Sequence, residues 1–221
     1  MLNPVDAFRS EIAISDTATL PGIDPLVRLR AETRAEHDAI EHALNLMDGQ
    51  LTLDGYRQRI EQFYGFYRPL EQKMLERKAW FSPWLDVGER VKTPLLVADL
   101  TALGSAPAPS LPLCGNLPGL EGPPECFGCL YVLEGSTLGG QVISRHVREK
   151  LNVTPGAGGL FFDGYGPRTG SMWQQFRLAL TGFSGDTRTT TGPADTQDRV
   201  VAAARLTFET LRRWCEHDPG S

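Results

Sequence analysis

The chain lacks several features that would define its class at once. No apolar run approaches the roughly 18 residues that span a bilayer, and the first residues lack the apolar core of a signal peptide. Four cysteines are too few for a disulfide scaffold in 221 residues. The net charge of −5 differs from the basic balance of general nucleic-acid-binding proteins. We therefore expect a cytoplasmic protein that binds neither membrane nor nucleic acid.

Complete motifs for two kinds of metal site are also missing. A structural zinc site needs two matching cysteine pairs, but Cys126-x-x-Cys129 is accompanied only by the isolated Cys114 and Cys215. The helical Glu-x-x-His motif of di-iron bundles does not occur. The cysteine pair leaves three interpretations open, which are buried small residues (the one we favour), redox chemistry and zinc.

What the chain does contain is helical periodicity along most of its length. Its apolar content of 41% can supply the core of one domain, and no segment alternates as a strand would. Apolar residues recur every three or four positions over about 25–48, 52–74, 93–104, 124–151, 173–180 and 200–215. Gly49 is the predicted stop of the first helix. We predict an all-α fold of about six to eight helices, with an N-terminal arm (1–23), one domain (24–217) and a C-terminal tail (218–221).

The first predicted helix carries a stripe of candidate ligand-binding residues. Because a helix turns about 100° per residue, Glu41 lies about 40°, Arg34 about 60° and Arg30 about 20° from His37. A neutral imidazole is a common ligand of haem iron, and a nearby carboxylate can fix its tautomer. Arginines on the same side can bind carboxylates at the edge of a ligand. A lone histidine on an apolar face is usually a core residue, but the whole stripe favours a ligand site.

The helix predicted from Pro124 to Leu151 carries Gly128, Gly135, Gly139 and Gly140. Each interior glycine costs about 1 kcal/mol relative to alanine, or about 3–4 kcal/mol together. A ligand close to the backbone, a kink or close helix packing can offset that cost. Helix packing through small residues is the simpler alternative. Opposite a ligating histidine, however, a bare helix face indicates a planar metal cofactor between two walls.

These two segments resemble a known family. The motif LRAETRAEHDAIEHALN, followed about ninety residues later by YVLEGSTLGGQVI, resembles the biliverdin-producing haem oxygenases, particularly their bacterial branch. The resemblance implies a single-domain all-α fold with haem between a proximal helix and a kinked distal helix. It also implies that haem is cofactor and substrate, cleaved with oxygen and reducing equivalents to biliverdin, carbon monoxide and iron. An electron donor such as ferredoxin or a flavin reductase is the implied partner.

On the proximal side, the resemblance assigns roles residue by residue. His37 matches the haem ligand, and Glu41 matches the acid that hydrogen-bonds to it. Arg30 and Arg34 match basic residues that contact the haem propionates, and Arg177 resembles a further propionate-binding arginine. These roles are expectations that follow from the family.

On the distal side, Gly135, Gly139 and Gly140 match flexible glycines over the iron, and Phe208 resembles an aromatic residue packed near the haem. Many members carry an aspartate directly after the first distal glycine, where it organises the water that delivers protons. Here Ser136 occupies that position, which puts the proton route in doubt. An alternative therefore stays open, in which the chain is a non-catalytic haem or bilin binding protein of the same fold.

The aromatic residues of the 52–74 segment complete the sequence-based expectations. We predict that Phe63, Tyr64, Phe66 and Tyr67 belong to the core and its packing surface, because they follow the helical spacing of the apolar residues around them.

Overall fold

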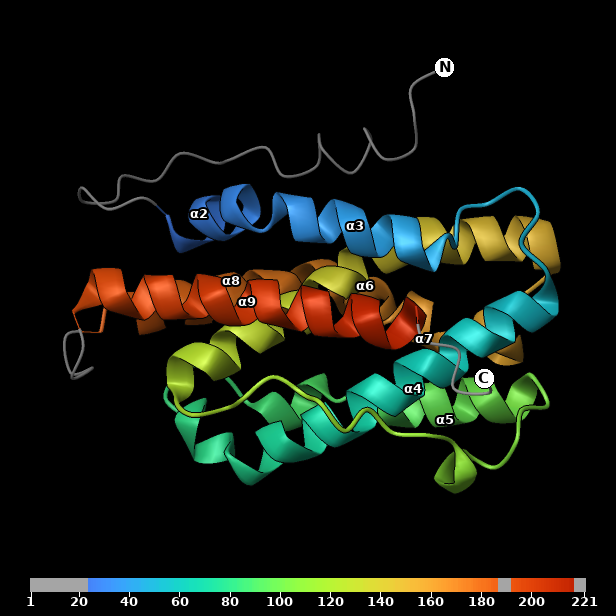
Figure 1. Cartoon of the computed structure of the whole chain (residues 1–221), viewed down its shortest axis with the longest axis horizontal. Coiled ribbons are helices and arrows are strands. Elements are labelled where there is room, and N and C mark those ends of the chain that lie inside the picture. Colours follow the sequence, from blue (N-terminus) through green and yellow to red (C-terminus); the bar gives the residue numbers. More distant parts are fainter. Residues whose placement is uncertain (1–23, 187–191, 217–221) are drawn as a thin grey trace, which may run out of the picture.

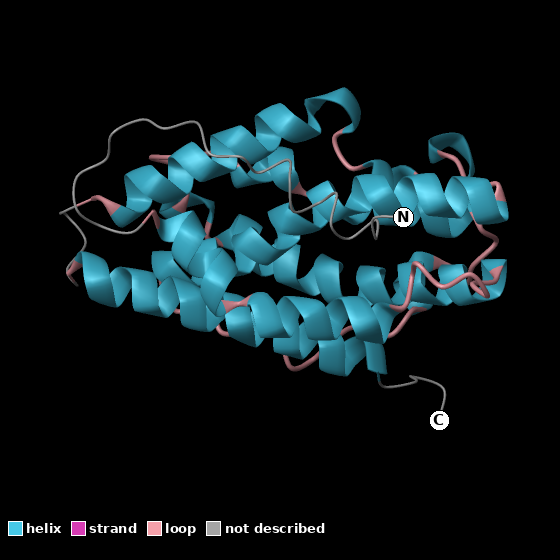
Figure 2. Ribbon diagram, turned by 90° about the horizontal axis from the view of Figure 1, so that it is seen from above, coloured by secondary structure: helices cyan, strands magenta, loops and turns pink. Residues whose placement is uncertain are grey.

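A computed structural model describes residues 24–186 and 192–216. The helices are α2 (Pro25–Glu32), α3 (Arg34–Leu44), α4 (Leu53–Glu76), α5 (Thr93–Ala102), α6 (Pro123–Leu151), α7 (Leu160–Asp163), α8 (Thr169–Ser184) and α9 (Pro193–Glu216). Short 3-10 turns are η1 (Lys78–Trp80), η2 (Val87–Arg90), η3 (Ala108–Ser110), η4 (Pro155–Ala157) and η5 (Gly166–Arg168). No strand occurs in these two ranges, which confirms the all-α prediction (Figure 2).

The two ends of the predicted domain scheme are not covered. The arm at 1–23 and the tail at 218–221 lie outside the described residues, so that division of the chain stays a prediction. Within the described part, no helix is long and apolar enough to cross a membrane.

Helix α9 lies at the centre of the arrangement. It packs against α6 and also contacts α2, α3 and α4. In Figure 1, α2 and α3 run along one side of α9, while α4 and α5 lie on its other side. Helix α9 therefore contacts both α3 and α6, the two helices that carry the predicted site.

The predicted helix over 25–48 is in fact two helices, so this detail of the prediction is wrong. Thr33 separates α2 from α3, with φ −105° and ψ 8°. Its side-chain hydroxyl donates to the carbonyl of Leu29 at 2.7 Å, a bond that competes with helix geometry. Asn45 in the left-handed region (φ 50°) ends α3, four residues before Gly49, the predicted stop. The apolar stripe is unbroken across Thr33, so periodicity alone could not reveal the break.

Helix α6 is held closely by two neighbours. A Cβ on Gly128 would lie 2.4 Å from the Val200 carbonyl oxygen, so α9 approaches α6 to a distance that only glycine permits. A Cβ on Gly140 would lie 2.7 Å from the Phe162 carbonyl oxygen, so α7 packs equally closely on another face. Asp99 holds α7 in place, since its carboxylate accepts hydrogen bonds from the first two backbone N–H groups of that helix, each at 2.8 Å.

Candidate functional site

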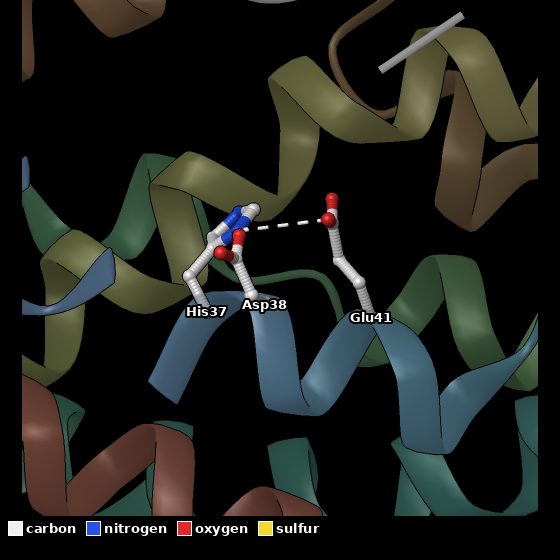
Figure 3. Close-up of side chains that lie close together, drawn as sticks. All are labelled: His37, Asp38 and Glu41. Carbon is white, nitrogen blue, oxygen red and sulfur yellow. Dashed lines mark ion pairs between the residues drawn. The ribbon is translucent and has the colours of Figure 1, made fainter. Parts of the chain in front are cut away.

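The candidate ligand, His37, lies on the side of α3 that faces α6. Figure 3 shows the His37 and Glu41 side chains rising from α3 toward the α6 ribbon. The His37 side chain is 38% exposed, and its Nδ1 lies 3.8 Å from Glu41 Oε2 and 3.9 Å from Asp38 Oδ1. These distances exceed a hydrogen bond but favour a proton on Nδ1. A ring protonated there presents Nε2 as its metal-binding nitrogen.

Asp38 was not predicted as part of the site. It lies about 100° around the helix from His37, off the predicted stripe. Its flexible side chain nevertheless brings a second carboxylate to Nδ1, and the donor atoms of His37, Asp38 and Glu41 all lie within 4.8 Å of one another. Two acids, rather than the single expected one, therefore face the same ring nitrogen.

Two contacts show that α3 and α6 run parallel to each other. Near the start of α3, Thr33 lies beside Tyr131 of α6, since burial raises the pKa of that phenol and the neighbouring Thr33 hydroxyl opposes the rise. Just beyond the end of α3, the Asp48 carbonyl lies 3.3 Å from His146 Nε2 of α6. The two contacts are separated by the same number of residues on each segment. On α6 this separation corresponds to about 22 Å of helix, whereas α3 ends at Leu44 and a turn leads on to Asp48. The helices thus meet at both ends of a shared interval.

The predicted ligand and the predicted bare wall occupy the same level of that interval. His37 follows Thr33 by one turn, and Gly135 follows Tyr131 by one turn, so each lies about 6 Å from the shared contact. Glu41 and Gly139 lie one further turn along. A Cβ placed on Gly135 or Gly139 would meet no neighbouring atom within 4 Å, so both glycines border open space. Helical register therefore places His37 and the bare stretch of α6 at matching heights on the two helices.

Aromatic side chains close one flank of this interval. Phe208 of α9 places its ring centroid 5.7 Å from that of His37, edge to face, and 6.5 Å from that of Tyr131. Trp173 of α8 continues the row at 6.3 Å from Tyr131. Phe208 is therefore placed where the sequence predicted an aromatic residue beside the ligand. Gly140 differs from its expected position, because its bare face meets α7 and not the open space.

The three predicted propionate-binding arginines are not all gathered at one point. Arg30 is exposed and close to Tyr131, since burial raises the pKa of that phenol and the charge of Arg30 opposes the rise. Arg34 is exposed, with Nε 3.7 Å from Asp38 Oδ2. Arg177 is half-buried on α8, which contacts both α2 and α6. Arg34 thus lies about one turn before His37 on α3, and Arg30 lies on α2 before the break at Thr33, whereas Arg177 belongs to a separate wall.

Ser136 is joined to Tyr67 of α4, a residue that the sequence predicted only as core. The Ser136 hydroxyl donates to the Leu133 carbonyl at 2.8 Å, and its Oγ lies 2.9 Å from the Tyr67 hydroxyl. A hydroxyl has one proton, so Tyr67 donates in this second bond. Burial raises the pKa of Tyr67, so the phenol keeps that proton. Ser136 is left with a lone pair that can accept a hydrogen bond from water.

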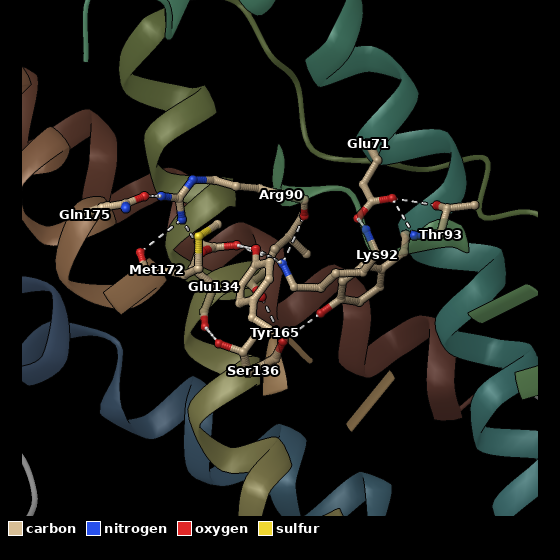
Figure 4. Close-up of polar contacts among 12 residues, drawn as sticks. Glu71, Arg90, Lys92, Thr93, Glu134, Ser136, Tyr165, Met172 and Gln175 are labelled. Carbon is tan, nitrogen blue, oxygen red and sulfur yellow. Dashed lines mark hydrogen bonds and ion pairs between the residues drawn. The ribbon is translucent and has the colours of Figure 1, made fainter. Parts of the chain in front are cut away.

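A buried ionic cluster lies directly before the bare stretch (Figure 4). Glu134 of α6 is 0% exposed, and its Oε1 accepts from Lys92 Nζ at 2.7 Å and from the Tyr165 hydroxyl at 2.6 Å. Its Oε2 accepts from Arg90 Nη1. No local pattern predicts this cluster, because its members come from distant segments and charged residues are usually exposed.

A family model and a solved structure match this chain. The family model described as "Heme oxygenase" matches residues 25–109 and 116–217. A solved structure of the NO- and CO-bound heme oxygenase from Neisseria meningitidis superposes with a TM-score of 0.71 at 18% sequence identity, covering 90% of this chain and 96% of that chain. At this identity the structural likeness establishes the fold. No curated protein sequence matches the chain.

Proposed function

Because the chain belongs to the haem oxygenase family, we propose that it binds haem and cleaves it with oxygen and reducing equivalents to biliverdin, carbon monoxide and iron. The observation that carries this proposal is the pairing of His37 with the bare stretch at Gly135 and Gly139, at the same level of two parallel helices. Bound haem supplies the iron that activates oxygen and the ring that is opened. The protein supplies the ligand, the orientation and the polar surroundings.

The residues present fit a haem on the proximal side. The acids beside His37 Nδ1 favour the tautomer that presents Nε2 to iron. Arg30 of α2 and Arg34 of α3 are exposed cations on either side of the break at Thr33, suited to charge-assisted bonds with propionates. Phe208 packs against His37 edge to face and limits rotation of the imidazole.

The distal residues leave room for a small ligand beside the polar Ser136 hydroxyl. Gly135 and Gly139 leave the volume that side chains would otherwise fill. Ser136 accepts from Tyr67 and offers one further acceptor lone pair, which can orient a water molecule. A water that donates to Ser136 keeps its second proton for a distal ligand. The serine can therefore perform the orienting task of the family's aspartate, although it holds no acidic proton of its own.

The lack of an acidic proton on Ser136 favours the second candidate, a haem or bilin binding protein without turnover. The Ser136 proton is committed to the Leu133 carbonyl, and the phenol of Tyr67 is a weak acid whose pKa is raised further by burial. If no solvent route delivers protons, haem is bound and not opened.

Reductive turnover of the haemin complex separates the two candidates. We expect haemin to produce a Soret band with the full chain, and ascorbate in air to convert that band to a biliverdin spectrum. A Soret band that survives reduction in air would favour the binding protein. The absence of any Soret band would contradict both candidates.

A matched pair of histidine substitutions tests the proposed ligand. His37→Ala should weaken or abolish the Soret band, because it removes the nitrogen that binds iron. His42→Ala is the control, since His42 lies on the same helix but is exposed and about 140° away from His37. The ligand assignment fails if His37→Ala retains both haemin binding and turnover, or if the two variants behave alike.

A further inference from the structure

The carboxylate of Glu134 is fully buried on the inner side of α6, immediately before the glycine that opens the bare stretch. Helical geometry places Glu134 about 100° from Gly135 and about 160° from Ser136. The carboxylate therefore points into the protein while the following residues border the open space. One turn on, the Thr137 hydroxyl donates to the Glu134 carbonyl at 2.6 Å and continues this buried inner face.

Each partner of Glu134 is itself fixed to another part of the fold. Arg90 of η2 also donates to the Met172 carbonyl of α8 at 3.2 Å. Lys92, which precedes α5, also donates to the Arg90 carbonyl at 3.1 Å and to the Tyr165 hydroxyl at 3.2 Å. Tyr165 lies between α7 and η5. Through one carboxylate, α6 is therefore tied to the segments around η2, α5, η5 and α8 (Figure 4).

This cluster anchors α6, because moving the helix would separate buried opposite charges. Lys92 and Arg90 are almost completely buried, so both cations depend on nearby anions for their stability. Glu71 accepts hydrogen bonds from the backbone N–H groups of Lys92 and Thr93, and the lysine ammonium is directed at Glu134. A rotation of α6 that withdrew Glu134 would leave two buried cations poorly paired. The cluster thus opposes rotation and displacement of the helix at this residue.

We propose that Glu134, held by Arg90, Lys92 and Tyr165, is a positioning residue that fixes the rotation and height of the Gly135–Gly139 stretch over the haem. It acts through the α6 backbone, which carries Ser136, and it does not touch the haem itself. This role rests on the proposed function, because it concerns the space opposite His37. The mechanical part of the role, restraint of α6, is present in the haem-free protein as well.

Amide hydrogen exchange of the full haem-free chain tests the restraint. In Glu134→Gln, and to a smaller extent in Tyr165→Phe, residues 135–140 should exchange at least about tenfold faster than in the natural chain, because a buried partner is lost. Glu71→Gln is the matched control, since Glu71 is also a buried acid bonded to the Lys92 segment but lies on α4. It should leave exchange in residues 135–140 unchanged. If Glu134→Gln does not fold, Tyr165→Phe decides, because it removes one hydrogen bond and no charge.

The infrared C–O stretch of the ferrous haem–carbon monoxide complex tests positioning. Glu134→Gln and Tyr165→Phe should shift or split this band, whereas Glu71→Gln should keep the natural band. If residues 135–140 exchange at the same rate in all variants, or exchange equally faster in Glu71→Gln, Glu134 does not restrain α6. Faster α6 exchange with an unchanged C–O band would overturn the positioning role. If the natural chain binds no haemin, the proposed function fails, and the exchange rates still decide whether Glu134 restrains α6.

Discussion

Single side chains in this protein take their chemistry from their surroundings more than from their type. Ser136 is only an acceptor toward the open space, because its proton is given to the Leu133 carbonyl. Two acids, Asp38 and Glu41, lie near Nδ1 of the His37 ring, although only Glu41 was expected from the helical stripe. The helical stripe therefore predicted that Glu41 lies near His37, but not the proximity of Asp38 to His37 or the bond between Tyr67 and Ser136. Both of those contacts depend on side-chain conformations that spacing does not determine.

The cysteines give a prediction at this same scale. Burial raises the pKa of Cys126 and of Cys129 to about 12, and both side chains are fully buried. At pH 8 we expect iodoacetamide to modify each at least about a thousandfold more slowly than a free thiol, because the thiolate is the reactive form. The rate should rise with pH up to about 12 instead of levelling near 9. Mass spectrometry with and without guanidinium measures this, and rapid labelling of the native chain at pH 8 would instead indicate a redox pair.

The helices of the described segments could largely be located from apolar spacing, whereas their interruptions and contacts could not. The glycines of α6 illustrate the difference. Gly128 and Gly135 lie on nearly the same helical face. The first is required by close packing on α9, and the second borders open space. The sequence suggested both explanations, packing and a ligand, and each applies at a different turn of one helix.

Two alanine substitutions on α6 should therefore have opposite effects on stability. Gly128→Ala should lower the free energy of unfolding by about 1–3 kcal/mol or more, because its Cβ would overlap the Val200 carbonyl. Gly139→Ala should raise it by up to about 1 kcal/mol, because alanine favours the helix and its Cβ meets nothing. Urea unfolding of the haem-free chain measures both. A destabilising Gly139→Ala would show that this glycine is needed for the fold and not for the space beside it.

Taken as a whole molecule, the chain shows why the fold class could be predicted and the site only in part. Helix content follows from local patterns, and the family motifs identified both walls. The Glu134 cluster joins residues that lie 31 to 44 positions from Glu134, so its charged members look like ordinary surface charges in the sequence. Arg177 and Gly140 are placed by the packing of α8 and α7, which no local pattern encodes.

The whole molecule also offers a competing location for a ligand. An open groove of about 830 Å³ lies between α3 and α9, lined by Ala35, Glu36 and Ala39 on a side of α3 away from His37. Its charged side chains are engaged in ion pairs such as Arg205–Glu36. It contains no histidine among its lining residues, so it offers no imidazole to iron.

A crystal structure of the haemin complex of the full chain tests the central claim most directly. The iron should lie within bonding distance of His37 Nε2, and the opposite face of the porphyrin should lie beneath Gly135 and Gly139. Haemin bound in the groove between α3 and α9, or iron held by any residue other than His37, would contradict the account.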